Sequence, residues 1–130
     1  MTQPAKNYGP IQTFLAGAAI TANKAVKLSA ANTVVHTTAI TDDVAGVALQ
    51  TVASGEYVDV QTMGKAKVRT SAAVNAMAQV MPTAAGDGEC STAAGATAKS
   101  FGIANSASGG IDGEVVEVLL RLGVNTPANT

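Results

Sequence analysis

Aromatic side chains are nearly absent from this sequence. Phe and Tyr together make up 3% of the residues and Trp does not occur, although 47% of the chain is hydrophobic. The apolar content is therefore mostly Ala and Val, which anchor a core less strongly than aromatic residues do. A core of this kind predicts a protein that draws part of its stability from partner subunits.

Charge is also scarce, and its two signs nearly balance. Eight basic residues stand against nine acidic ones, and charged residues are 13% of the chain. A nucleic-acid binder needs a basic excess to displace counterions from phosphates, so no nucleic-acid partner is expected. Such low charge suits a protein docked on a larger assembly better than a monomer that must stay soluble alone.

Reactive side chains are equally few. The single Cys90 cannot form an intrachain disulfide, and the single His36 has no Cys or carboxylate at metal-ligand spacing. No catalytic residue, metal ligand or cofactor is therefore expected, and the protein is interpreted as a non-enzyme. No apolar run approaches the ~18 residues of a membrane span, so no membrane partner is expected. The apolar stretch 14–20 is a poor signal peptide because it is short and follows two prolines.

The acidic residues and the glycine-rich run have structural interpretations. Asp42 and Asp43 precede an apolar segment and are typical of a turn. Glu56 and Glu114 occupy equivalent places in two similar segments, which indicates a shared structural role rather than a catalytic pair. The run 108–113 lacks the Gly-Lys-Ser/Thr ending of a phosphate-binding loop and is interpreted as a hairpin tip.

The chain contains the same strand–turn–strand phrase twice. Gly46-Val47-Ala48, a turn and Gly55-Glu56-Tyr57-Val58-Asp59-Val60 correspond to Gly102-Ile103-Ala104, a longer turn and Gly113-Glu114-Val115-Val116-Glu117-Val118. Each copy places Gly where the backbone needs freedom and Val at alternate positions afterwards. This pattern predicts two related β units.

Alternating and β-branched runs predict an all-β fold, a small barrel or sandwich of short strands. The expected strands are 13–20, 25–28, 33–37, 44–49, 57–63, 65–70, 78–81, 89–92, 101–105 and 114–122. One short helical turn is expected over Ala72–Ala76 after Ser71, and Asp87-Gly88 is a hairpin signal. We therefore divide the chain into an extended N-terminal arm (1–12), a single β domain (13–123) with an internal repeat at about 19–64 and 73–123, and a polar tail (124–130).

Two surfaces of the expected strands carry unusual side chains. Lys65, Lys67 and Arg69 form a basic stripe, which is either a solvated strand face or a docking stripe for an acidic protein surface. On the last strand, the face opposite the apolar one carries Val115, Glu117, Leu119 and Arg121. A half-apolar face is typical of a strand under a loop or at a subunit seam, and we favour the seam.

These phrases resemble a known family. Ala19–Ala22 before Val26, Val44–Ala48, Gly55–Val60, Ser71–Val74 before Val80, and the second copies at Gly102–Ala104 and Gly113–Val118 are similar to the small capsid decoration, or cement, proteins of tailed bacteriophages. The likeness covers about residues 13 to 122. It implies a β-rich homotrimer on the outer surface of the virion capsid, clamping neighbouring major capsid subunits. The arm and the polar tail depart from the family pattern.

The arm is the second expected contact with the capsid. Prolines and Tyr8 have less freedom to lose on ordering than most residues, so the hypothesis is that the arm lies along the capsid or a neighbouring subunit. The residues assigned to this contact are Gln3, Pro4, Asn7, Tyr8, Pro10 and Ile11. The alternatives are another oligomeric virion component, such as a tail or fibre subunit, and a soluble β-barrel that binds a small ligand.

Overall fold

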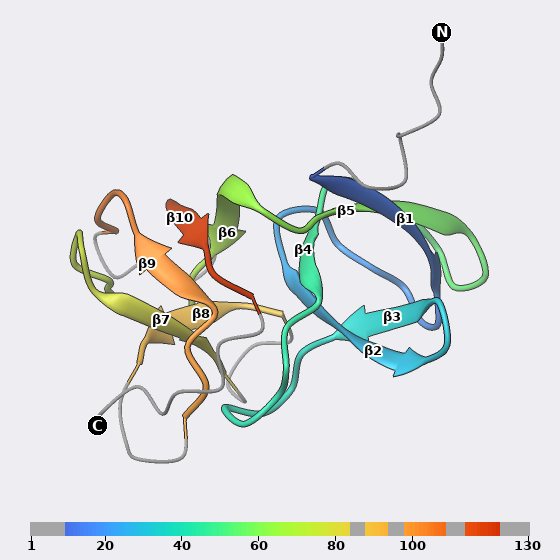
Figure 1. The fold of residues 1–130 in the computed structure, drawn as a ribbon, viewed down its shortest axis with the longest axis horizontal. Helices are drawn as coiled ribbons and strands as arrows, with labels where there is room; N and C mark the ends of the chain where they lie inside the picture. The colour runs from blue at the N-terminus through green and yellow to red at the C-terminus, as the bar shows by residue number, and fades with distance from the viewer. Residues whose placement is uncertain (1–9, 84–87, 94–97, 109–113, 123–130) are drawn as a thin grey trace, which may run out of the picture.

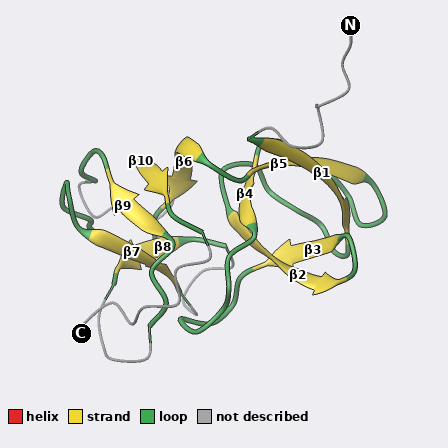
Figure 2. Ribbon diagram, viewed as in Figure 1, coloured by secondary structure: helices red, strands yellow, loops and turns green. Residues whose placement is uncertain are grey.

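The computed structural model describes residues 10–83, 88–93, 98–108 and 114–122, and these ranges contain ten strands and no helix (Figures 1 and 2). The strands are β1 (Ile11–Ala16), β2 (Ala25–Ala30), β3 (Thr33–His36), β4 (Gly46–Ala48), β5 (Tyr57–Gln61), β6 (Gly64–Arg69), β7 (Gln79–Pro82), β8 (Cys90–Thr92), β9 (Gly102–Ala104) and β10 (Val115–Leu120). The predicted all-β class of short strands is confirmed.

The first five strands form a closed barrel, which we call the N-terminal unit. Their order around the barrel is β1-β3-β2-β4-β5, and all neighbours are antiparallel except β1 and β3. The parallel β1–β3 pair, with Leu15 opposite Thr33 and Ala16 opposite Val34, closes the barrel. Closure leaves no unpaired sheet edge in this unit.

The last five strands repeat this pairing and form the C-terminal unit. Their order is β6-β10-β9-β7-β8, and each antiparallel pair has its counterpart in the barrel. The parallel β1–β3 ladder is reduced here to one parallel bridge between Thr70 and Cys90. Thr70 N–H donates to Glu114 O as Ala16 N–H donates to Glu56 O, which places Thr70 and Ala16 at equivalent positions.

The repeat extends to individual backbone conformations. Asn23 (φ 67°) and Met77 (φ 73°) are both left-handed, and each donates its N–H to the last residue of the equivalent strand, Ala48 or Ala104. Left-handed Asn32 (φ 55°) likewise corresponds to Gly88 (φ 76°). The two units are therefore equivalent well beyond the repeated sequence phrases.

Each unit has its own apolar core. Val26, Val34, Val58 and Val60 are fully buried in the N-terminal barrel. The core of the C-terminal unit contains the equivalent residues Val80, Cys90, Val116 and Val118 and also Phe101, together with Ala25, Val44 and Val47 from the N-terminal unit. The second core is thus completed by the first unit, so the two units form one body.

At the junction between the units, residues of the N-terminal unit lie between β6 and β8 of the C-terminal unit. Arg69 N–H donates to Asn23 O (2.8 Å), and Ala25 N–H donates to Gly88 O (2.7 Å). Gly88 N–H in turn donates to Thr37 O (2.8 Å). Residues 23–25 thereby take the place that the partner strand occupies in the closed barrel, which explains why the second sheet is closed only by the Thr70–Cys90 bridge.

Two expected local structures differ in the molecule. Residues 72–76 form no helical turn, because Val74 is buried and bridges Ser108, whose N–H donates to Val74 O (2.9 Å). Burial of Val74 and its hydrogen bonds with Ser108, which is distant in the sequence, outweigh the weak helix preference of the alanines. The first strand begins at Ile11 rather than at residue 13, so the end of the assigned arm lies in β1.

The strand repeat also has other limits than the assigned 19–64 and 73–123. It begins at β1 and again at β6, because both opening strands have equivalent partners. Part of the Asp87-Gly88 turn and the tail 124–130 lie outside the described residues.

Candidate functional site

The outward face of β6 and β10 brings together the two surfaces singled out in the sequence. Strand alternation buries Ala66, Val68, Val116 and Val118 and turns the intervening side chains outward. In the β6–β10 ladder, Lys65 lies opposite Leu119, Lys67 opposite Glu117, and Arg69 opposite Val115. We call these six residues the β6–β10 face.

This arrangement places the basic stripe and the residues assigned to the subunit seam side by side on one surface. Adjacent strands lie about 5 Å apart, so a partner that covers Leu119 also covers Lys65. Val115 and Leu119 are each 38% exposed, and the ladder places them beside the basic residues. Arg121 lies beyond the ladder, where its N–H donates to Phe101 O. The β6–β10 face is therefore one surface with a mixed basic and apolar character.

Arg69 has a structural role that its place in the stripe did not reveal. Its Nε donates to Ala22 O (3.2 Å) and its backbone N–H to Asn23 O, so both groups hold the junction. By contrast, the ammonium groups of Lys65 and Lys67 make no hydrogen bond or ion pair with any residue of the described ranges. The cations available to a partner on this face are these two lysines.

Glu117 is held in place by the C-terminal unit itself. Asn105 Nδ2 donates to Glu117 Oε1 (3.0 Å), and Glu117 N–H donates to Ser106 Oγ. Asp59 of the N-terminal unit has the same arrangement, because Gln50 both donates to its carboxylate and accepts its N–H. These carboxylates tie each outer face to the neighbouring loop.

The arm joins the molecule beside this face. Gln3, Pro4, Asn7 and Tyr8 lie outside the described residues. The carbonyl of Pro10 accepts hydrogen bonds from Thr62 N–H (2.6 Å) and Thr62 Oγ1 (3.1 Å), between β5 and β6. The described part of the chain therefore begins at Pro10, beside the connection between β5 and β6.

Exposed apolar groups lie at this point of attachment. Ile11 is 47% exposed and Met63 is 55% exposed. Gln61, opposite Ile11, donates from Nε2 to the carbonyls of Met63 and Lys65. The alternating pattern predicts a strand that continues to Met63, but β5 ends at Gln61.

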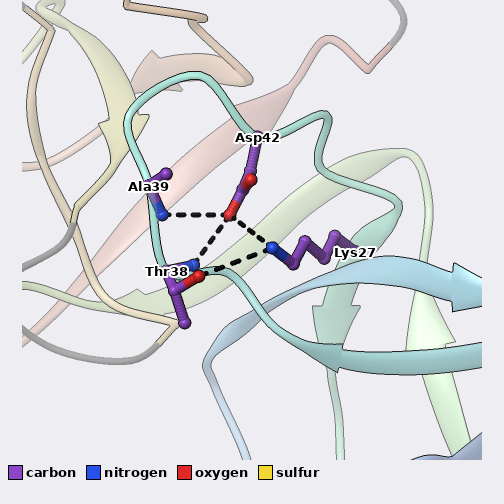
Figure 3. Close-up of polar contacts among 4 residues, drawn as sticks. All are labelled: Lys27, Thr38, Ala39 and Asp42. Carbon is purple, nitrogen blue, oxygen red and sulfur yellow. Dashed lines mark hydrogen bonds and ion pairs between the residues drawn. The ribbon is translucent and has the colours of Figure 1, made fainter.

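A second polar cluster lies at the turn that follows β3 (Figure 3). Asp42 Oδ2 accepts the N–H groups of Thr38 (2.7 Å) and Ala39 (3.0 Å) and lies 3.1 Å from Lys27 Nζ. The turn role expected for Asp42 is thus confirmed. Two open depressions of about 490 and 300 Å³ flank the cluster and share Lys27 in their linings. The polar groups of the cluster bind one another, which leaves them little capacity to hold a ligand.

The contacts of Asp42 make its ionisation a contribution to stability. Partial burial alone would raise the pKa of Asp42, but the hydrogen bonds from Thr38, Lys27 and Ala39 outweigh it and lower the pKa below the ordinary 3.8. A lowered folded-state pKa stabilises the protein above the unfolded-state value and loses this contribution as pH falls through the folded-state value.

We expect Asp42→Asn to lower the free energy of unfolding at pH 7 by about 1–2 kcal/mol, because two backbone donors lose a charged acceptor. Thermal unfolding of both proteins at pH 7 and below pH 3.8 measures the effect, and the difference should shrink in acid. Asp43→Asn is the matched control, since the Asp43 side chain is 72% exposed and forms a surface ion pair with Lys99. Equal losses in the two variants would contradict the role of Asp42.

The titratable residues that were considered as candidates for catalysis are buried or hydrogen-bonded to the backbone. Cys90 is buried, and burial, with a smaller effect of Glu89, raises its pKa to about 12. His36 Nε2 accepts the N–H of Thr21 (2.9 Å). Glu56 accepts Ala53 N–H at the turn before β5. Within the described ranges, no three His, Cys, Asp or Glu side chains lie close enough together to hold a metal ion.

None of the described residues forms a helix with the length and hydropathy that crossing a bilayer requires.

Comparisons with known proteins bear on the fold. No protein-family model matches this sequence, and no curated protein matches it. Among solved structures, the fold is similar to the crystal structure of the head fibre gp8.5 N base of bacteriophage phi29, with a TM-score of 0.66. The match covers 85% of this chain and 92% of that chain at 16% sequence identity. The likeness therefore includes nearly all of that base and both units of this chain.

Proposed function

We propose that this protein is a structural component of a phage virion, attached to the outside of the head as the base of a projecting fibre. The observation that carries the proposal is the fold shared with a phage head-fibre base over almost its whole length. The surroundings of Cys90 and His36 agree with a structural role, because neither is poised as a nucleophile or base. Proteins that share a fold can differ in function, so the proposal is tested at the attachment surface.

The attachment surface in this proposal is the β6–β10 face together with the arm. Lys65 and Lys67 supply positive charge, while Val115 and Leu119 supply apolar area. Charge on such a surface mainly sets the rate and register of docking, and the apolar groups add affinity. The arm, which enters at Pro10 beside Lys65, extends the contact along the acidic surface of the major capsid protein that we propose as partner.

A capsid clamp without a fibre is the second candidate. The repeated strand phrases of the chain, which resemble those of decoration proteins, favour it. In this role the protein acts as a trimer that bridges neighbouring capsid subunits. Once one contact has formed, the others are effectively intramolecular, which raises the overall affinity by about 10²–10⁴-fold. The two roles share the same head-binding surface and differ in whether the bound protein raises the thermal stability of the head.

Binding of the purified protein to heads that lack it tests the proposal. We expect Lys67→Glu to weaken binding by about tenfold or more, because a charge is reversed at the centre of the β6–β10 face. Lys99→Glu is the matched control: it also reverses one lysine, but that lysine pairs with Asp43 away from this face. Cosedimentation gives the affinities, and cryo-electron microscopy of the heads locates the protein.

Deletion of the arm is the second variant in the same assay. The deletion must stop at residue 9, because Ile11 and Gln12 pair with Gln61 and Val60 in β1. The shortened protein should fold normally by circular dichroism and lose head binding. Binding to tails instead of heads, or full head binding by both the Lys67→Glu protein and the deletion, would refute the proposed attachment.

A further inference from the structure

The cores of the two units differ in where their side chains come from. Every member of the barrel core belongs to the N-terminal unit, and Phe14 and Val52 pack against it from the same unit. In the core of the C-terminal unit, by contrast, Ala25, Val44 and Val47 are supplied by the N-terminal unit. The barrel therefore fills its own interior, whereas the C-terminal unit depends on the barrel for part of its interior.

The backbone shows the same asymmetry. The barrel is closed by the ladder between β1 and β3, which are two of its own strands. In the C-terminal unit this ladder is reduced to the Thr70–Cys90 bridge. Beside the bridge, Arg69 N–H donates to Asn23 O, and Gly88 O accepts the N–H of Ala25. The barrel thus supplies groups that close the second sheet, while its own closing ladder needs no strand of that sheet.

Loss of the junction has unequal consequences for the two units. For the barrel, it exposes Ala25, Val44 and Val47, and none of the three belongs to the barrel core. For the C-terminal unit, it removes part of the core and the backbone partners of Arg69 and Gly88. Parts of a protein open at free energies that follow their buried apolar contacts and protected hydrogen bonds. The C-terminal unit should therefore open more easily than the barrel.

We infer that this molecule opens in one direction only. The C-terminal unit can unfold while the barrel stays folded, but the barrel cannot unfold without also unfolding the C-terminal unit. The β6–β10 face lies wholly on the C-terminal unit, so this face exists only while the barrel holds the junction together. The inference concerns the chain by itself and does not rest on the proposed attachment to a head.

Native-state hydrogen exchange tests the inference, because it measures the free energy of opening at single amides. Ala16 and Thr70 are equivalent buried reporters, whose N–H groups donate to Glu56 O (2.8 Å) and Glu114 O (2.7 Å). In the natural chain the Thr70 amide should be less protected than the Ala16 amide by about tenfold or more. Equal protection of the two amides would mean that the units open together, and would overturn the inference.

A matched pair of substitutions identifies which unit opens first. Val58 and Val116 are fully buried at equivalent positions, Val58 in the barrel core and Val116 in the second core. Val58→Ala should speed exchange at Ala16 by about tenfold or more and leave Thr70 unchanged, because the barrel is still folded when the C-terminal unit opens. Val116→Ala should speed exchange at both amides, because the C-terminal unit is unfolded in both openings.

Val47→Ala tests the junction itself. Val47 lies in β4 of the barrel, but its side chain is buried in the core of the C-terminal unit. This variant should therefore behave like Val116→Ala and speed exchange at both amides, although it changes a barrel strand. An effect of Val47→Ala on Ala16 alone would overturn the inference. So would an effect of Val58→Ala on both amides, or of Val116→Ala on Thr70 alone.

Discussion

Replacing Gly46 or Gly102 by alanine is expected to lower the free energy of unfolding by about 3 kcal/mol or more at each site. A Cβ at Gly46 would lie 2.4 Å from the backbone oxygen of Gln61 and 2.4 Å from Val60 Cγ1. At Gly102 the same atom would lie 2.5 Å from the oxygen of Leu119 and 2.5 Å from Val118 Cγ1. The carbonyl belongs to the paired strand, so relief requires the β4–β5 or β9–β10 ladder to move apart.

Thermal unfolding followed by circular dichroism measures both variants, and the midpoint should fall by about 10 °C in each. Gly55→Ala is the control, because a Cβ there meets no atom within 4 Å and only the left-handed φ of +88° opposes it. That strain costs about 1 kcal/mol. Losses at Gly46 and Gly102 no larger than at Gly55, or very unequal to each other, would contradict the equivalence of the two units.

The strand pattern of this fold was predictable because its signals are local. Val58 and Val60 alternate with polar neighbours as Val116 and Val118 do, and all four are fully buried. The recurring Gly-Val-Ala and Gly-Ile-Ala phrases correspond to β4 and β9, where the glycine lets two backbones approach. Period-two alternation and a glycine before a strand are properties of a few consecutive residues, so one sequence is enough to read them.

The boundaries and the junction depend on contacts that sequence patterns do not reveal. The first strand begins at Ile11 because Ile11 and Gln12 pair with Gln61 and Val60, about fifty residues away in the chain. The alanines after Ser71 favour a helical turn locally, but pairing with Ser108 prevails. Arg69 reads as one more exposed cation, although its partner, Ala22, lies in the other unit.

The sequence predicted the two rows of residues of the candidate surface but not that they lie side by side, for the same reason. Alternation turned Lys65 and Lys67 outward on one strand and Val115 and Leu119 outward on another. That the two rows are adjacent follows from the β6–β10 pairing, which is a long-range contact. The sequence likewise did not indicate the left-handed backbone of Met77, which becomes apparent only when Met77 is compared with the equivalent Asn23.

At the junction, the expected result of Gly88→Ala is a loss of about 2–4 kcal/mol of stability, the sum of backbone strain and overpacking. Gly88 has φ +76°, and a Cβ would lie 2.7 Å from Lys24 Cβ and 2.9 Å from Ala25 O. Both atoms belong to the N-terminal unit, and Ala25 also donates its N–H to Gly88 O. The added carbon can fit only if the hairpin withdraws from the barrel, which breaks this hydrogen bond.

Asn32→Ala is the matched control, because Asn32 holds the equivalent place on the other hairpin, with φ 55°, but is exposed to solvent. It should lose only the preference of Asn for this conformation, about 1 kcal/mol. Thermal unfolding compares the two variants, and hydrogen exchange should show faster exchange of the Ala25 amide in the Gly88→Ala protein alone. If the two variants were equally stable and Ala25 stayed protected in both, the hairpin would not be what joins the units. A loss of stability at Gly88 alone would mean that the C-terminal sheet depends on the N-terminal unit for its closure, because residues 23–25 occupy the gap between β6 and β8.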